Sequence, residues 1–328
     1  MNKERLVPLF VLMFAALWGA AVAQTPPKVY RLGLLGCGPP PADSSDIVAG
    51  LIRGLAQRGY MLNHNVAFER RGAQFHFKHL PELVDELLAS GVDVIVPTCY
   101  PAAAAAQQVT KTIPIVSAGT SDAVATGLVT DLSRPGGNIT GITDVSDKLS
   151  AKRLELLKET VPGLRRVVML YNAADLGMTQ RFQVATFAAQ TLRLTILPLA
   201  VHEPLDFDKA FAAITPELTD GLLMVTDALT AGNRRRVFEF AAQQRLPAIY
   251  EFEALARGGG LMSYGPDMVE IQDRVAGLID RILKGAKPGE LPFEQPTRFR
   301  FVINLKAAKA LGLTFPESIL GRADEIIE

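Results

Sequence analysis

Polar side chains recur directly after apolar runs in this sequence, where they could bind a small molecule. Thr120 and Ser121 follow an apolar run at residues 113–118, and Asp227 follows another at residues 221–226. Hydroxyls and backbone amides bind carboxylates, whereas an aspartate binds ammonium groups. The residues of this kind that we expect to form a binding site are Cys37, Cys99, Tyr100, Gly119, Thr120, Ser121, Asp122, Asn172, Asp227, Tyr250, Glu251 and Tyr264.

Each of these residues also has an ordinary structural explanation. Thr120 and Ser121 could cap a helix, and Asp227 could bond its own backbone in a turn. We expect Thr230 to cap the next helix, which would leave Asp227 available for a ligand ammonium group. Glu251 could be a second cation partner or a solvated side chain. The tyrosines suit a pocket for a molecule with an apolar or aromatic body, but they could equally close strand ends by packing.

Patterns typical of catalysis or metal binding are weak. His76 and His79 are three residues apart with no clear third ligand nearby, so we interpret them as the solvated start of a helix. Gly33, Gly36 and Gly38 resemble a nucleotide-binding loop only loosely, because prolines follow where a phosphate-binding helix should begin. The sequence has no Gly-x-Ser-x-Gly and no Walker lysine motif. We therefore expect neither an enzyme nor a bound cofactor or metal.

The hydrophobic pattern predicts the scaffold that positions these candidates. Short apolar runs alternate with segments whose apolar residues recur at helical spacing. This alternation predicts an α/β fold with doubly wound parallel sheets, in which ligands bind beyond the carboxyl ends of the strands. The main expected strands are residues 29–36, 65–70, 92–97, 113–118, 166–171, 194–201, 221–226 and 246–250.

Two glycine-rich segments interrupt this series. At residues 133–143, Pro135 stiffens the entry to a turn, and Gly136 and Gly137 can adopt backbone angles closed to other residues. We interpret this segment as a hinge between two similar lobes, with an ordinary surface turn as the alternative. A second crossover is expected at residues 258–265.

The amino terminus has the layout of a secretory signal. Lys3 and Arg5 precede an uncharged run at residues 6–18, and Ala21 and Ala23 are the small residues before a cut after Ala23. Residues 1–23 are thus expected to be removed on export to the periplasm; a membrane anchor is the alternative.

Export would place the two cysteines in a compartment that permits disulfides. Cys37 and Cys99 end strands that should be neighbours in a sheet of order 2-1-3-4-5, so they could form a disulfide or remain free thiols.

The charges of the chain balance. With 34 basic and 34 acidic residues, the sequence gives no reason to expect binding to nucleic acid or to an anionic membrane surface. A small molecule or a protein is the expected partner.

Several motifs resemble one known family. They are Leu-Pro-Ala-Ile-Tyr-Glu at residues 246–251, Gly-Gly-Leu-Met-Ser-Tyr-Gly-Pro-Asp at 259–267, Ile-Leu-Lys-Gly-Ala-Lys-Pro-Gly-Glu-Leu-Pro at 282–292, Val-Ile-Asn-Leu-Lys-Ala-Ala-Lys-Ala-Leu-Gly at 302–312 and Arg-Pro-Gly-Gly-Asn-Ile-Thr-Gly at 134–141. Over essentially its whole mature length, the chain resembles the ABC-transporter substrate-binding family that includes the tryptophan-binding TrpX-like proteins.

The resemblance implies a type I periplasmic binding fold, with two doubly wound parallel-sheet lobes joined by three crossovers and a ligand trapped between them. It also implies that residues 99–101 and 119–122 hold a ligand carboxylate, and that Asn172 and Asp227 hold its ammonium group. The lobes expected on this basis are residues 24–143 with 264–290, and residues 144–263 with 291–328.

The function expected from the resemblance is that of a periplasmic solute-binding protein of an ABC importer. Its ligand would be an aromatic or branched amino acid or a related carboxylate, and its partner an ABC permease in the inner membrane. A periplasmic sensor that presents its closed form to a membrane signalling protein is the alternative. In either role we expect a monomer.

Overall fold

The computed structural model describes residues 28–215 and 217–328. The expected signal peptide, residues 1–23, lies outside the described residues, so the cut after Ala23 stays a prediction. Within the part of the chain that the structure describes, no helix is long and apolar enough to cross a membrane.

The first lobe is built on a parallel sheet with the strand order β2-β1-β3-β4-β5, as the sequence predicts. Its middle strands are apolar because helices cover both faces of the sheet; Leu32, Leu34 and Leu35 of β1 are all buried. The strands are β1 (Tyr30–Gly36), β2 (Val66–Gly72), β3 (Val94–Pro97), β4 (Ile115–Thr120) and β5 (Ile139–Thr143).

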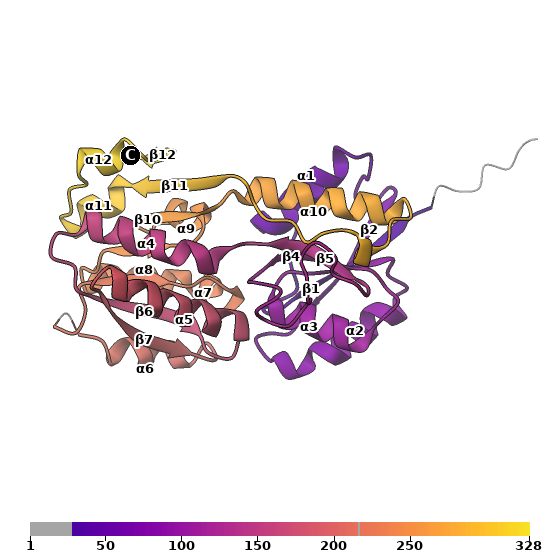
Figure 1. Ribbon diagram of the computed structural model, residues 1–328, viewed down its shortest axis with the longest axis horizontal. Coiled ribbons are helices and arrows are strands. Elements are labelled where there is room, and N and C mark those ends of the chain that lie inside the picture. Colours follow the sequence, from indigo (N-terminus) through magenta and orange to yellow (C-terminus); the bar gives the residue numbers. More distant parts are fainter. Residues whose placement is uncertain (1–27, 216) are drawn as a thin grey trace, which may run out of the picture.

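Two helices far apart in the sequence lie side by side on this lobe (Figure 1). The helix α1 can approach α10 closely because Gly50 and Gly54 face it; a Cβ on Gly54 would lie only 2.8 Å from the Cβ of Ala276. Ser45 caps α1 by accepting a hydrogen bond from the backbone N–H of Val48. The helices of this lobe are α1 (Asp46–Ala56), η1 (Phe77–His79), α2 (Leu80–Ala89), α3 (Tyr100–Val109), α10 (Met268–Leu283) and η2 (Pro288–Glu290).

The second lobe has a larger sheet with the strand order β12-β11-β10-β9-β8-β6-β7. Among its described strands, the pairing of β10 with β11 is antiparallel and the other pairings are parallel. The antiparallel pair was not expected. It arises because β10 carries the chain toward the first lobe and β11 brings it back (Figure 1). The strands are β6 (Arg166–Asn172), β7 (Thr195–Val201), β8 (Gly221–Met224), β9 (Ala248–Tyr250), β10 (Met262–Pro266), β11 (Phe299–Asn304) and β12 (Glu325–Ile327).

Helices cover this second sheet, and its core is formed by their apolar faces and by apolar strand residues such as Met169, Leu223 and Ile249. The helices are α4 (Ser146–Thr160), α5 (Leu176–Thr191), α6 (Asp206–Ala212), α7 (Ala228–Gly232), α8 (Arg234–Gln243), α9 (Glu253–Arg257), α11 (Leu305–Leu311) and α12 (Glu317–Leu320).

The chain passes between the lobes between β5 and α4, between β10 and α10, and between Glu294 and β11. The expected boundaries at residues 264 and 290 therefore differ slightly from the observed arrangement. The strand β10 continues in the second sheet to Pro266, and Glu294 still pairs with the first lobe by accepting a hydrogen bond from the backbone N–H of Thr143.

The interpretation of the Pro-Gly-Gly turn as the hinge is wrong. Gly136 and Gly137 do adopt positive φ angles, of 68° and 62°, but the N–H of Gly136 donates to the carbonyl of Gly289 and the turn is packed within the first lobe. The strand β5 follows it in the first sheet. The crossover comes later, at Asp144 and Val145.

Candidate functional site

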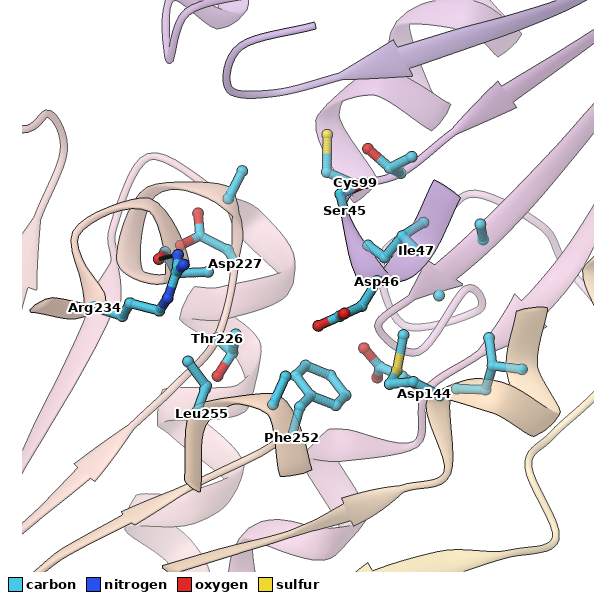
Figure 2. A pocket seen from close by; sticks show the side chains of 18 of the residues that line it. Ser45, Asp46, Ile47, Cys99, Asp144, Thr226, Asp227, Arg234, Phe252 and Leu255 are labelled. Atoms are coloured by element: carbon cyan, nitrogen blue, oxygen red, sulfur yellow. Dashed lines mark hydrogen bonds between the residues drawn. The ribbon is translucent and has the colours of Figure 1, made fainter. Parts of the chain in front are cut away.

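A cavity of about 550 Å³ lies between the two lobes. It is bounded by the carboxyl ends of β3, β4 and β8 and by the starts of α1, α3 and α7, which is where α/β sheets usually bind ligands. Figure 2 shows Asp46 of the first lobe and Phe252 of the second pointing into this pocket. Both lobes thus contribute walls to one cavity.

The first-lobe wall combines the N-termini of two helices with the carboxylate of Asp46. The cavity is lined there by Ser45 and Asp46 at the start of α1 and by Cys99 and Tyr100 at the start of α3. No side-chain cap of α3 is found in the described part of the chain, so the first turn of this helix opens toward the cavity without one. Helix N-termini carry partial positive charge and free N–H groups, so the start of α3, which has no acidic residue in its first turn, can bind an anionic group such as a carboxylate.

The second-lobe wall presents two aspartates. Asp175 caps α5 by accepting a hydrogen bond from the N–H of Gly177 at 2.8 Å, and its side chain is buried. Burial, together with the charge of nearby Asp227, raises the pKa of Asp175 to about 7. Burial and the charge of Asp175 also raise the pKa of Tyr100, on the opposite wall. This end of the cavity therefore favours a positively charged group.

Asp227 is held in place by hydrogen bonds with two neighbours, Asn172 and Thr230. Its carboxylate accepts hydrogen bonds from the N–H of Thr230 at 2.9 Å and from the side-chain amide of Asn172 at 2.7 Å, and the N–H of Asp227 donates back to the hydroxyl of Thr230. The prediction that Thr230 caps the helix is wrong, because Asp227 is the N-cap of α7. The carboxylate nevertheless still lines the cavity.

Apolar side chains form much of the remaining surface of the cavity, next to the polar side chains of Thr226 and Arg234. Phe252 and Leu255 contribute from the second lobe, and Ile47, Met268 and Ile271 contribute from α1 and α10 of the first. A ligand that fits here has an apolar body beside its charged ends.

A buried network of charges lies at the base of the cavity. The guanidinium of Arg181 donates to Asp144, to Glu251 at 2.9 Å and to the hydroxyl of Ser121 at 3.1 Å. Arg153 donates to Glu251 at 2.9 Å and to the carbonyl of Tyr264, which lies just before the second crossover. The network pairs two guanidinium groups with two carboxylates and joins both lobes near their connections. Its geometry fixes the arrangement of the crossovers.

The structure brings some of the expected site residues to the cavity wall. These are Cys99, Tyr100, Gly119, Ser121 and Asp227.

Other expected residues lie behind the wall. Asn172 orients Asp227, and Glu251 is occupied by Arg153, Arg181 and the N–H of Thr226, so Glu251 is neither solvated nor free for a ligand cation. Thr120 is buried, and its hydroxyl has no hydrogen-bond partner within the described chain.

Two tyrosines and one aspartate point elsewhere. Tyr250 is buried in the core of the second lobe with its ring edge-on to Phe238, and the ring of Tyr264 packs against Phe299 and Phe301. Asp122 bonds the backbone of its own turn and lines a smaller pocket of about 260 Å³ beside α5. The packing explanation holds for these rings, because Tyr250 and Tyr264 lie within β9 and β10, where side chains alternate between the two faces of the sheet and do not point along the strand into the cleft.

Cys37 and Cys99 form a disulfide, with their Cα atoms 6.2 Å apart. The bond joins the end of β1 to the start of α3, and Cys99 itself lines the cavity. Cys37 therefore supports the wall without lining it.

The sequence did not reveal Asp46, Asp175 or Phe252 as cavity residues. A signal was present for Asp175, which lies three residues beyond the strand-end Asn172, as a helix cap would. In the described ranges, no group of three or more His, Cys, Asp or Glu side chains could hold a metal ion, and His76 and His79 contact each other edge to face.

Comparison with known proteins agrees with this geometry. Residues 42–327 match the family model described as ABC transporter substrate binding protein. The chain belongs to this family. Members bind substrates and are not enzymes, and the architecture is that of the type I periplasmic binding proteins, as expected from the resemblance.

Three relatives of this substrate-binding protein are similar over most of its length. A tyrosine-binding protein of Clostridioides difficile is 26% identical over 265 residues, which cover 80% of this chain and 76% of the relative. A conserved domain protein of Vibrio cholerae has 27% identity and a TM-score of 0.85, over 91% of this chain and 100% of that one. An ABC domain from Streptococcus pneumonia in complex with L-Trp has 26% identity and a TM-score of 0.83, over 92% of this chain and 100% of the other.

Proposed function

We propose that this substrate-binding protein serves an ABC importer and traps an aromatic or branched amino acid, or a related carboxylate, between its lobes. The observation that carries the proposal is the distribution of groups around the cavity. Helix N-termini line the first-lobe wall, Asp175 and Asp227 line the second, and an apolar surface lies beside them. An amino acid with an apolar side chain carries the three complementary groups.

Each charged group of such a ligand has a partner of opposite charge or partial charge in the cavity wall. The ammonium group would bind the carboxylates of Asp175 and Asp227, and the carboxylate would bind at the start of α3 and near Ser121. The side chain would pack against Phe252 and Ile271. A cavity of about 550 Å³ is within the range of pockets that enclose small organic ligands.

The relatives support the aromatic part of this proposal. One is described as a tyrosine-binding protein, and another was solved in complex with L-Trp. The secretory layout of residues 1–23 supports a periplasmic location, from which a monomer would deliver the ligand to a permease in the inner membrane.

The proposal is tested first by finding the ligand. Native mass spectrometry of freshly purified protein should detect a co-purified molecule, and titration calorimetry should then show binding of L-tyrosine, L-tryptophan, L-phenylalanine or L-leucine. Binding of none of these amino acids would reject the proposed ligand class.

The role of Asp227 is tested by Asp227→Asn, which keeps an oxygen acceptor for the helix cap but removes the charge. We expect the affinity for the amino acid to fall by about 2–4 kcal/mol. The matched control is Asp206→Asn, because the carboxylate of Asp206 also accepts backbone hydrogen bonds, from the N–H groups of His202 and Glu203, but does not line the cavity. Equal affinities of the wild type and Asp227→Asn for the amino acid would show that the charge of Asp227 does not bind the ligand.

A further inference from the structure

One loop of the first lobe reaches into the second. The ring of Phe75, between β2 and η1, packs against the hydrophobic cluster of the second lobe that includes Leu229 of α7. A Cβ on Gly38 would lie 3.0 Å from Cε1 of this ring, and a Cβ on Gly232 of α7 would lie 3.5 Å from its Cζ. The ring is therefore enclosed between the first lobe and α7.

The contact is reciprocal. Ala228 of α7 packs against the first-lobe cluster that contains Cys37 and Ala73, next to the loop that carries Phe75. A Cβ on Gly38 would also lie 3.6 Å from the Cβ of Ala228. Each lobe thus places one apolar side chain in the hydrophobic cluster of the other.

The backbone of this loop is strained and is held by the first lobe alone. Gln74 and Phe75 have φ angles of +51° and +68°, in the left-handed region that bulky side chains rarely adopt. Their N–H groups donate to the carbonyls of Gly38 at 2.9 Å and Cys37 at 2.8 Å, and Cys37 is fixed by the disulfide to Cys99. Hydrogen bonds within the first lobe therefore fix the direction of the ring, whereas the second lobe provides a surface on which the ring packs.

We propose that Phe75 is a positioning residue for ligand capture, whose ring stabilises the closed arrangement of the lobes by packing on α7. This inference depends on the trapping of a ligand between two lobes set out under the proposed function. Because the loop moves with the first lobe, opening of the lobes would draw the ring away from Gly232 and expose it to water. The same helix also contributes to the binding site, because its N-cap Asp227 and its residues Ala228 and Ala231 line the cavity.

The expected size of the effect follows from the burial of the ring. Phe75 is partly buried, so removal of the ring should weaken closure by about tenfold, less than for a fully buried phenylalanine. A ligand trapped in the closed form should then dissociate about tenfold faster, because escape requires opening.

The first experiment uses tryptophan as a reporter in the full chain. The only tryptophan of the sequence, Trp18, precedes the expected cut after Ala23, so Phe75→Trp gives the exported protein a single tryptophan. We expect its emission to be shifted to shorter wavelength and shielded from acrylamide, in contrast to Phe187→Trp, because Phe187 is 74% exposed on α5. Equal quenching of the two variants, with and without L-tyrosine, would overturn the proposal.

The second experiment measures the dissociation of L-tyrosine. Phe75→Ala should dissociate about tenfold faster than the wild type, and Phe75→Leu should lie between them; Phe187→Ala should match the wild type. Gly232→Ala adds a methyl group 3.5 Å from Cζ of Phe75 and should slow dissociation in the wild type but not in Phe75→Ala. The same effect of Gly232→Ala in both backgrounds would contradict a contact between the ring and α7.

The two proposals fail in different ways. If L-tyrosine does not bind, that result counts against the ligand class alone, and the tryptophan reporter is read again with the molecule that native mass spectrometry finds bound to the purified protein. A tryptophan at position 75 that is quenched equally with and without that molecule would overturn the role of Phe75 in closure. Urea unfolding of each variant shows whether the lobes remain folded, and Phe75→Leu replaces any variant that does not fold.

Discussion

The substitution Asp175→Asn should change how the stability of this protein depends on pH. Asp175 lies buried in the cavity wall, and burial raises its pKa from the usual 3.8 to about 7. Asparagine is nearly the same size and keeps an oxygen to accept the hydrogen bond from the N–H of Gly177. The variant therefore removes the titration while preserving the cap of α5.

The sign of the effect follows from the direction of the pKa shift. Between about pH 4 and pH 7 the unfolded chain has released the proton of Asp175, whereas the folded protein retains it. Folding is then favoured at the acidic end of this window and loses about 1.4 kcal/mol for each unit of rising pH. Over the whole window the loss amounts to about 4 kcal/mol, which Asp175→Asn should abolish.

The measurement is urea unfolding of the wild type and the variant at several pH values, monitored by circular dichroism. The free energy of unfolding of Asp175→Asn relative to the wild type should increase by about 3 kcal/mol between pH 5 and pH 8. Asp85→Asn on the exposed surface of α2 is the control for loss of a carboxylate elsewhere. Parallel pH curves for the wild type and Asp175→Asn would refute the reasoning that burial holds a proton on Asp175.

Three further variants test other parts of the structure. Arg181→Met should destabilise the protein by about 3–5 kcal/mol in urea unfolding, because it leaves two buried carboxylates without this partner, and a loss below about 1 kcal/mol would contradict that account. Replacing both Cys37 and Cys99 by serine should cost about 4 kcal/mol in thermal unfolding, since the disulfide closes a loop with a sequence separation of 62; reduction of the wild type should have the same effect. Gln272→Met should raise stability by about 1–2 kcal/mol by calorimetry, because both amide atoms of Gln272 are buried and lack hydrogen-bond partners in the described chain; a loss of stability would indicate a bridging water.

The fold was predictable because its signals are local and repeated. Apolar runs such as the one in β1 and helical spacing such as that of Ile271, Val275 and Ile279 in α10 depend only on which face each residue presents. The sheet order of the first lobe and the presence of a second lobe followed from these patterns. The antiparallel return of β11 did not, because it depends on where the chain re-enters the sheet after crossing to the other lobe.

The hinge shows where a local signal misleads. Gly136 and Gly137 do form the sharp turn that their sequence predicts, but a turn of this type suits a packed loop as well as a crossover. The actual crossover at Asp144 and Val145 has no glycine; it is defined by the salt bridge of Asp144 with Arg181, a residue 37 positions away.

By itself, the sequence determined that polar and aromatic residues follow the strands, and hence the edge of the sheets at which a ligand site lies. Only the tertiary structure decided which of them face the cavity. Asp227 lies after β8 and Tyr250 is the last residue of β9, yet one lines the cavity and the other is buried in the core. The physical reason is that the sequence locates the end of a strand only approximately, whereas the direction of a side chain there depends on where the strand ends and on the partners that distant segments supply: Asn172 for Asp227, and Phe238 for Tyr250.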